Sequence, residues 1–340
     1  MVTNTVEVKQ LNVERVRKVV QKYISCTKSQ VSKETHLSIA TCGTILNEMV
    51  TSGEVIKIDE KETQIGRPAD LFVYNGDFLH VLCVCLEFEN GISTVRVAIA
   101  NALGAVVSTE DHIQANLSYD TLEAIIETYV NSNKKIASIG IGLPGIITDG
   151  IVESCDIKSF KGLALSQRLS KKFGVNVLVE NDMNCIIYSL YRGLPENSGD
   201  IAVIFFPKGQ DSCVGCGFMI NGRIHRGATM AAGEISDIIS GFGIPRNVQQ
   251  QMLDAPMLFH QLAAQALLTI IGTVNPAIAI FMGNDITRSD LESIYRKCRE
   301  VVSERHIPTL ELDNNISRNY LNGAIRLLLD SIQFSILIRQ

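Results

Sequence analysis

The sequence predicts an α/β protein with a small N-terminal module and a larger, internally duplicated domain of two lobes. Residues 11–53 carry hydrophobic residues at helical spacing, whereas residues 80–142 and 200–224 contain two sets of strand-like runs. The charge is also uneven. Residues 1–50 hold seven Lys and Arg against four Asp and Glu, a net +3, which leaves −8 for the rest of a chain whose total is −5.

The bulk composition is that of a globular protein with a large core. Of the 340 residues, 46% are hydrophobic and 20% are charged, and the length suits two or three domains. The net charge excludes a protein that coats nucleic acid along its whole length, but a basic N-terminal segment suits a small DNA-reading module. We find no signal peptide and no apolar run of about eighteen residues, so we expect a cytoplasmic protein.

The nine cysteines are scattered, which indicates free thiols in a reducing compartment. Cys83 and Cys85 alternate along a predicted strand, and we expect both thiols to pack in the core. Cys213 and Cys216 have the spacing of a metal site, but no second Cys or His pair lies at a matching distance. We therefore expect no metal at this pair.

Three helices are predicted near the N-terminus. The first covers residues 11–24, and the residues at helical spacing within it are Leu11, Val16, Val19, Val20, Tyr23 and Ile24. Thr27 is a suitable N-cap for a short second helix that ends at a turn near His36. Ser38 is the N-cap of a third helix, which Gly53 terminates. Spacing predicts one inward face of this third helix, formed by Cys42, Ile45, Leu46 and Met49.

The order of elements in this module is that of a winged helix-turn-helix. After the third helix, residues 54–58 alternate as a strand, a polar tip follows, and residues 66–69 lead into a second strand at 71–73. The alternative is a three-helix bundle that binds protein, which the absence of Lys and Arg from the third helix favours. The tight spacing of the second and third helices and the Lys/Arg cluster favour DNA binding.

Eight residues are expected at the DNA interface. We assign phosphate contacts to Lys28, Ser29 and Lys33, and place Thr41, Thr44 and Asn47 near base edges. Ser38 begins the same helix and belongs to this surface. Arg67, just past the wing, is suited to a phosphate or to the minor groove.

The second part of the chain alternates strands and helices. We predict strands at 80–88, 94–100 and 103–107, with Asn90-Gly91 as a hairpin turn, then a helix at 118–131 and a strand at 136–142. This set is half of an actin/hexokinase-type (duplicated ribonuclease H-like) fold. A second set begins at residues 200–206 and continues through 215–224. Duplication of this kind creates two lobes with a ligand cleft between them.

The predicted domains are residues 1–76, residues 77–193 as the first lobe, and residues 194–315 as the second lobe. A C-terminal helix from Ile316 to about Ile338, within residues 316–340, presents one apolar face and is expected to pack back on the first lobe. That face consists of Leu321, Ile325, Leu328 and Ile332. A helix-swapped interface between two copies is the alternative.

Several motifs, in order, resemble those of the ROK family of repressors and sugar kinases, particularly its xylose-repressor-like branch. Gly140-Ile-Gly-Leu-Pro-Gly145 is similar to that family's GIGxPG loop, and Glu180-Asn-Asp-Met-Asn184 is similar to its ENDxN signature. Residues 221–227 with Ala232-Gly-Glu234 resemble its NGxxxxG…AGE segment. Together with the repressor-like head at residues 27–69, the resemblance covers nearly the whole chain.

The resemblance implies a sugar site at the lobe junction. Asp182 matches the position of the catalytic base, Asn181 that of a sugar contact, and Glu234 that of a second hydroxyl contact. Pro144, Gly145 and Asp237 complete the expected ligand-binding set; Asp237 stands where the family commonly has a His. A carboxylate beside an amide suits hydroxyl chemistry. The alternative is that Asn181 and Asp182 only cap the following helix.

Departures from the family pattern argue against kinase activity and cofactors. The first phosphate loop, typically DxGGT, is replaced by Glu87–Thr94, with bulk and two carboxylates where phosphate would lie. The second glycine loop retains part of its glycines over 209–217, and GGG becomes Gly283-Asn-Asp285. Acidic groups near a polyphosphate are repulsive, so we expect neither ATP nor Mg²⁺. The zinc motif is absent, because residues 240–255 contain no cysteine.

Three functions are therefore compared. The first is a transcription regulator that binds operator DNA as a homodimer or dimer of dimers and senses a sugar or sugar derivative, with Asp182 as a vestigial base position. The second is a sugar kinase with an attached DNA-binding head. The third is a regulator with a vestigial cleft that a protein partner controls. No membrane partner is expected.

Overall fold

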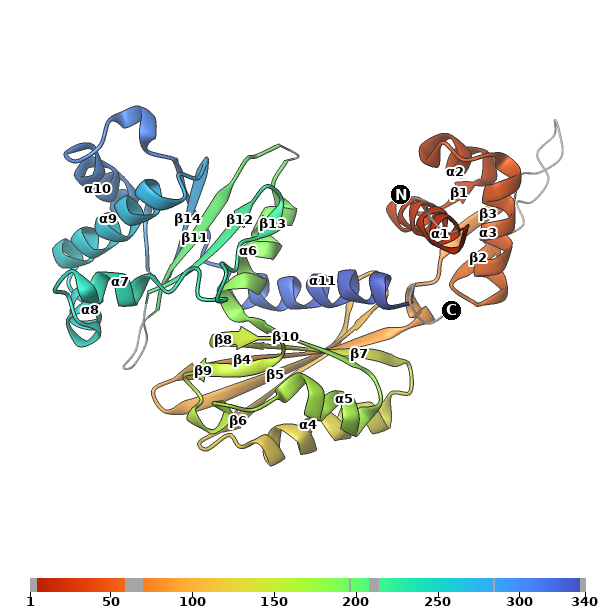
Figure 1. The fold of residues 1–340 in the computed structure, drawn as a ribbon, viewed down its shortest axis with the longest axis horizontal. Helices are drawn as coiled ribbons and strands as arrows, with labels where there is room; N and C mark the ends of the chain where they lie inside the picture. The colour runs from red at the N-terminus through yellow and green to blue at the C-terminus, as the bar shows by residue number, and fades with distance from the viewer. Residues whose placement is uncertain (1–4, 59–69, 196, 208–213, 284, 337–340) are drawn as a thin grey trace.

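A computed structural model describes residues 5–58, 70–195, 197–207, 214–283 and 285–336, and it has an α/β fold with mixed sheets. Figure 1 shows an N-terminal module set apart from two sheet-containing lobes, with one long helix, α11, running between the lobes toward that module. Arg67 and the rest of the predicted wing tip lie outside the described residues, as do Cys213 and Asn284. None of the described helices is long and apolar enough to cross a membrane.

The N-terminal module consists of helices against a small antiparallel sheet of order β1-β3-β2. The bounds are α1 (Thr5–Lys22), β1 (Cys26–Thr27), α2 (Lys28–Thr35), α3 (Ile39–Thr51), β2 (Val55–Ile58) and β3 (Leu71–Tyr74). Both predicted caps are present: Thr27 Oγ1 accepts a hydrogen bond from Gln30 N at 3.2 Å, and Ser38 Oγ accepts one from Thr41 N at 3.1 Å. His36 makes the tight turn between α2 and α3 with φ of 56°.

Packing in this module follows the predicted inward face of α3 and part of the apolar set predicted on α1. The four apolar residues predicted on α3 are all buried: Cys42, Ile45, Leu46 and Met49. The prediction for the first helix was wrong at its end, because α1 stops at Lys22 and Ile24 is 95% exposed. Leu11 is also exposed. Val16, Val19 and Val20 are buried in the core of the module, and Tyr23 packs against it partly buried.

The first lobe is a five-stranded sheet of order β10-β7-β4-β5-β6. Its elements are β4 (His80–Glu89), β5 (Ile92–Asn101), β6 (Val106–Gln114), α4 (Tyr119–Ser132), β7 (Ile136–Leu143), β8 (Gly145–Thr148), β9 (Ile151–Cys155), α5 (Leu165–Phe173) and β10 (Asn176–Asn181). Alternate residues of β4 face opposite sides, as the period of a strand requires. Leu82 and Val84 pack with α4 and α5, whereas Val81 and Cys83 pack with α11.

Two details of this sheet test the sequence predictions. The Asn90-Gly91 hairpin is confirmed: both residues have positive φ, 51° and 78°, and Glu89 pairs with Ile92. The strand predicted at 103–107 was misplaced, because Leu103 and Gly104 form the turn and β6 begins at Val106. Since β6 is an edge strand with an exposed, polar sequence, hydrophobic alternation did not reveal it.

The second lobe repeats the arrangement with sheet order β13-β12-β11-β14-β15. Its elements are β11 (Ile201–Phe206), β12 (Gly215–Ile220), β13 (Arg223–Ile224), α7 (Ile235–Gly241), α8 (Arg246–Leu253), α9 (Pro256–Thr273), β14 (Ile278–Gly283), α10 (Arg288–Arg299) and β15 (Thr309–Leu312). On one face, Phe206 meets Phe259 edge-to-face, with ring centroids 5.3 Å apart, in the core formed with α9 and α10.

Helices α6 (Asp182–Gly193) and α11 (Ile316–Ile336) fill the space between the lobes. Cys85 from the first sheet, Val203 and Ile280 from the second sheet, and Tyr320 from α11 belong to one buried cluster with residues of α6. The expected burial of Cys83 and Cys85 is confirmed, at 0% and 1% exposure. The two lobes are therefore joined by a shared apolar layer, at whose edge α6 begins.

Candidate functional site

The outward face of α3 is the first candidate site. Thr44 and Asn47 are exposed and, with Glu48, Thr51 and Ser52, line a shallow hollow on the surface. The Thr44 hydroxyl donates to the Ala40 carbonyl at 3.2 Å. Its methyl group is therefore the part of the side chain available for contact with another molecule. At the start of the helix, Thr41 and Ser38 hydroxyls lie 2.8 Å apart.

The residues of α2 that were predicted to contact phosphates differ in their surroundings. Ser29 and Lys33 are exposed on α2. Lys28 lies against the ring of Phe72 and forms an ion pair with Asp70, Nζ to Oδ2 3.6 Å. Lys57 pairs with the same carboxylate at 3.0 Å, and its hydrogen bond is the largest of the effects that lower the pKa of Asp70. Lys57 was not singled out from the sequence, although its place on a predicted strand next to the predicted wing tip is a signal.

The second candidate site is at the junction of β10 and α6, where four of the predicted sugar-site residues meet. The Asn181 side chain bridges two segments: its Oδ1 accepts from Asn184 N at 3.0 Å, and its Nδ2 donates to the Gly145 carbonyl at 3.0 Å. Pro144 and Gly145 begin the β8 hairpin beside it, and Asp182 follows in sequence. Asn181 therefore caps α6 and also ties the loop after β7 to it.

The glycines of residues 140–145 have separate structural reasons. A Cβ on Gly145 would lie 2.2 Å from the Ser154 carbonyl oxygen, which enforces the tight β8–β9 hairpin. A Cβ on Gly142 would lie 2.5 Å from the ring of Tyr320. The absence of a side chain at Gly142 therefore lets Tyr320 of α11 pack directly against the backbone of β7. The two glycines thus allow the close approach of the β8–β9 hairpin strands and of α11 to this segment.

Carboxylates dominate the electrostatics around Asp182. Its Oδ1 accepts a hydrogen bond from Met183 N at 2.8 Å, which favours ionisation, but burial and the nearby charges of Asp156 and Glu234 outweigh this and raise its pKa to about 7. The pKa of Glu234 is also raised, chiefly by burial and then by Asp237. Asp182 is therefore partly protonated at neutral pH and able to donate or accept a hydrogen bond.

Glu180 and Arg226 connect the two lobes next to these carboxylates. Arg226 follows β13 in the second lobe, and its guanidinium donates to Glu180 of β10, with Nε to Oε2 at 3.2 Å. The other Glu180 oxygen accepts from Asn184 Nδ2 at 2.8 Å. Neither Glu180 nor Arg226 was assigned a role from the sequence, although both lie inside the quoted motifs.

Asp237, unlike Asn181 and Asp182 of the predicted sugar site, is not at the junction of β10 and α6. It lies on the exposed side of α7 and pairs with Arg246 of α8 at 2.7 Å. The buried Gln249 of α8 is the main link here, because its Nε2 donates to Ser236 O, Ser240 Oγ and Ile244 O at 2.9, 3.0 and 2.9 Å. In the part of the chain that the structure describes, no three His, Cys, Asp or Glu residues are grouped to hold a metal ion.

A family model matches the central part of the chain. Residues 84–247 match the model of the ROK family. A xylose repressor of Bacillus subtilis is 22% identical over 245 residues, which cover 70% of this chain and 63% of that protein. A regulator described as DNA-binding transcriptional dual regulator NagC, from Escherichia coli K12, is 24% identical over 68% of this chain and 58% of its own length. The matches thus span less than two thirds of these relatives.

Solved structures show the same fold. A ROK family transcriptional regulator, described as a homolog of the E. coli MLC protein, superposes with a TM-score of 0.69 at 19% identity. It covers 98% of this chain and 100% of that one. A ROK family glucokinase from Streptomyces griseus, in complex with glucose and AMPPNP, superposes with a TM-score of 0.57 at 15% identity over 74% of this chain and 99% of its own.

Proposed function

Because this chain carries a ROK family domain, we propose that it is a transcriptional regulator whose N-terminal module, a winged helix-turn-helix, binds operator DNA. The observation that carries the proposal is the geometry of α2 and α3: a capped pair of helices joined by the tight turn at His36, with Thr44 and Asn47 exposed on the outer side. Asn pairs with adenine edges and the threonine methyl suits thymine in the major groove. The names of the relatives, a xylose repressor and a DNA-binding transcriptional dual regulator, support the same function.

We further propose that a sugar or sugar derivative binds around Asn181, Asp182 and Glu234 and biases DNA binding of a homodimer. Asp182 with a pKa of about 7 and the raised pKa of Glu234 suit hydrogen bonds to sugar hydroxyls. Because the Glu180–Arg226 pair joins the lobes beside them, a ligand there has contacts that depend on lobe geometry. We also propose that Asp182 occupies the position of a catalytic base without acting as one.

The kinase alternative is supported by the position and pKa of Asp182, which suit a general base. Against it, the hairpin that takes the place of the first phosphate loop is closed by the two-residue turn at Asn90-Gly91. Glu87 within that hairpin is paired with Arg96 at 3.3 Å. From these features we propose that the chain has no catalytic activity and binds neither ATP nor Mg²⁺. We also propose no zinc cofactor, because residues 240–255 contain no cysteine. ATP turnover that Asp182→Asn abolishes would favour the kinase instead.

Operator binding is tested with fragments selected from genomic DNA by the full-length protein, followed by anisotropy titrations. The double variant Thr44→Ala/Asn47→Ala is expected to lose at least about tenfold in affinity, since a base contact contributes roughly 1–3 kcal/mol. The matched control is Thr128→Ala/Asn131→Ala on α4. It removes the same two side chains at the same spacing, and Thr128 likewise donates to the carbonyl four residues earlier, at 3.1 Å. Equal affinities for both variants would refute the proposal.

Sugar binding is tested by thermal shift across sugars, amino sugars and their phosphates. A ligand at about 100 times its dissociation constant stabilises the native state by roughly 2.7 kcal/mol. Glu234→Gln, which keeps the size of the side chain, is expected to abolish the shift. If no ligand shifts the transition, a protein partner becomes the controlling input.

A further inference from the structure

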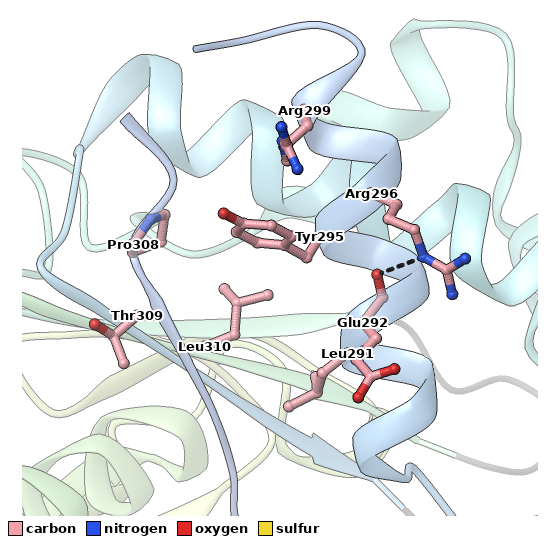
Figure 2. Close-up of a pocket in the computed structure, with 8 residues that line it drawn as sticks. All are labelled: Leu291, Glu292, Tyr295, Arg296, Arg299, Pro308, Thr309 and Leu310. Carbon is pink, nitrogen blue, oxygen red and sulfur yellow. Dashed lines mark hydrogen bonds between the residues drawn. The ribbon is translucent and has the colours of Figure 1, made fainter. Parts of the chain in front are cut away.

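A hollow of about 500 Å³ lies in the second lobe, between α10 and β15. Figure 2 shows Tyr295 and Arg299 pointing from α10 toward Pro308, above Leu310, whereas Arg296 is turned along the helix to the Glu292 carbonyl. Leu291, Pro308, Leu310 and the ring of Tyr295 form its apolar part. Glu292, Arg296 and Thr309 line its border, and the Arg299 guanidinium lies at one end. None of these residues belongs to either candidate site described above.

One border of this groove is an open sheet edge. β15 is the last strand of its sheet, and Thr309 N and Asp313 N donate to the Ala277 and Phe281 carbonyls on the β14 side, at 3.0 and 3.1 Å. Since hydrogen-bonding direction alternates along a strand, the backbones of Leu310 and Leu312 face away from β14. Among the described strands, none pairs with that edge. It is a place where another strand can add.

The end of the groove already holds a carboxylate. Tyr295 OH donates to Glu304 Oε1 at 2.7 Å, and Arg299 Nη2 lies 3.5 Å from Glu304 Oε2. The Arg299 and Glu304 side chains are 53% and 63% exposed, so solvent screens this pair and it contributes little to stability. A carboxylate from another chain can therefore replace that of Glu304 at small cost.

We propose that the groove between α10 and β15 binds an extended, acidic peptide segment of a partner protein. The segment adds to the free edge of β15 through backbone hydrogen bonds to Leu310 and Leu312. Its apolar side chains lie over Leu291 and the ring of Tyr295, and one carboxylate takes the position of Glu304 on Arg299. The inference does not depend on operator or sugar binding.

The probe is a library of seven-residue peptides displayed on phage and panned against the full-length protein. Enriched peptides are synthesised with a fluorescein label and titrated by anisotropy. Arg299→Glu is expected to weaken binding at least about tenfold, because it replaces a charge-assisted pair with a repulsive one. Arg288→Glu makes the same charge change in the exposed first turn of α10 and is the control. Glu304→Ala is expected to strengthen binding, because it removes the competing carboxylate.

Hydrogen exchange of the complex separates strand addition from nonspecific charge attraction. Bound peptide is expected to slow exchange of the Leu310 and Leu312 amides, and replacing alternate peptide residues with proline is expected to abolish binding. Three results would each overturn the proposal: a library with no binder, peptides that bind Arg299→Glu as tightly as the native chain, or unchanged exchange at Leu310 and Leu312.

Discussion

Gly323 of α11 faces the carbonyl of Cys185 of α6 so closely that a Cβ on Gly323 would lie 1.8 Å from the Cys185 oxygen. This contact sets the crossing of the two helices that fill the space between the lobes. Since α6 begins at Asp182, the position of the candidate sugar site depends on a glycine more than a hundred residues later in the chain.

Gly323→Ala is expected to destabilise the protein by about 3 kcal/mol or more, because overpacking against backbone cannot be relieved by rotating a side chain. Gly272→Ala on α9 is the matched control, since nothing lies within 4 Å of a Cβ there. That control is expected to be neutral or stabilising by up to ~1 kcal/mol. Thermal unfolding followed by circular dichroism measures both, and equal transition temperatures would contradict the assigned contact.

Arg17 and Glu54 form a buried ion pair that joins α1 to the start of β2, with Arg17 Nη2 to Glu54 Oε2 at 3.1 Å. Arg17 also pairs with Glu14, so Glu54→Gln keeps one charged partner for the buried guanidinium. This change is expected to destabilise the N-terminal module by roughly 1–3 kcal/mol, because a charge-assisted hydrogen bond in a buried pair is weakened. Arg17→Met/Glu54→Met is expected to cost less than the single change. Hydrogen exchange in α1 and β2 measures the effect. A double variant less stable than Glu54→Gln would show that the charges themselves stabilise the module.

Asp182 is expected to make stability fall as pH rises. Its folded-state pKa, about 7, lies above its usual value of 3.8, so the folded protein binds the proton more tightly than the unfolded chain does. Stability is therefore highest below the lower value, declines between the two, and levels off above pH 7. Asp182→Asn is expected to remove this decline. Melting temperatures of both proteins between pH 4.5 and 8.5 test it, and parallel curves would disprove the assignment.

Gln249→Glu is expected to detach α8 from α7. The amide nitrogen of Gln249 donates to three oxygens, whereas a carboxylate placed there faces the same oxygens without a donor. Each buried group left unsatisfied costs roughly 1–3 kcal/mol. Gln250→Glu, one residue later on the same helix, is the control. Faster amide exchange in α7 for Gln249→Glu alone would support this link, and identical exchange would argue against it.

Local features were predicted well where short-range chemistry decides them. Thr27 and Ser38 cap α2 and α3 because their side chains satisfy amides three residues ahead, and Asn90-Gly91 closes a hairpin because both residues accept positive φ. The buried face of α3 follows from spacing alone. The errors came where burial depends on neighbours. Ile24 and Leu11 are as apolar as Val16, but the described residues leave them 95% and 54% exposed. β6 carries no hydrophobic alternation because it lies at an edge.

The sequence by itself determined the α/β class, the caps, the turns and the identity of the motifs, because these depend on residues within a few positions of one another. Only the tertiary structure decided which charges meet. It pairs Glu180 with Arg226 from the other lobe and holds Lys28 and Lys57 on one aspartate. It also buries Asp182 and places Asp156 and Glu234 near it, and these effects together raise its pKa. The physical reason is that burial and Coulomb interactions depend on distance in space, which spacing along a chain does not specify.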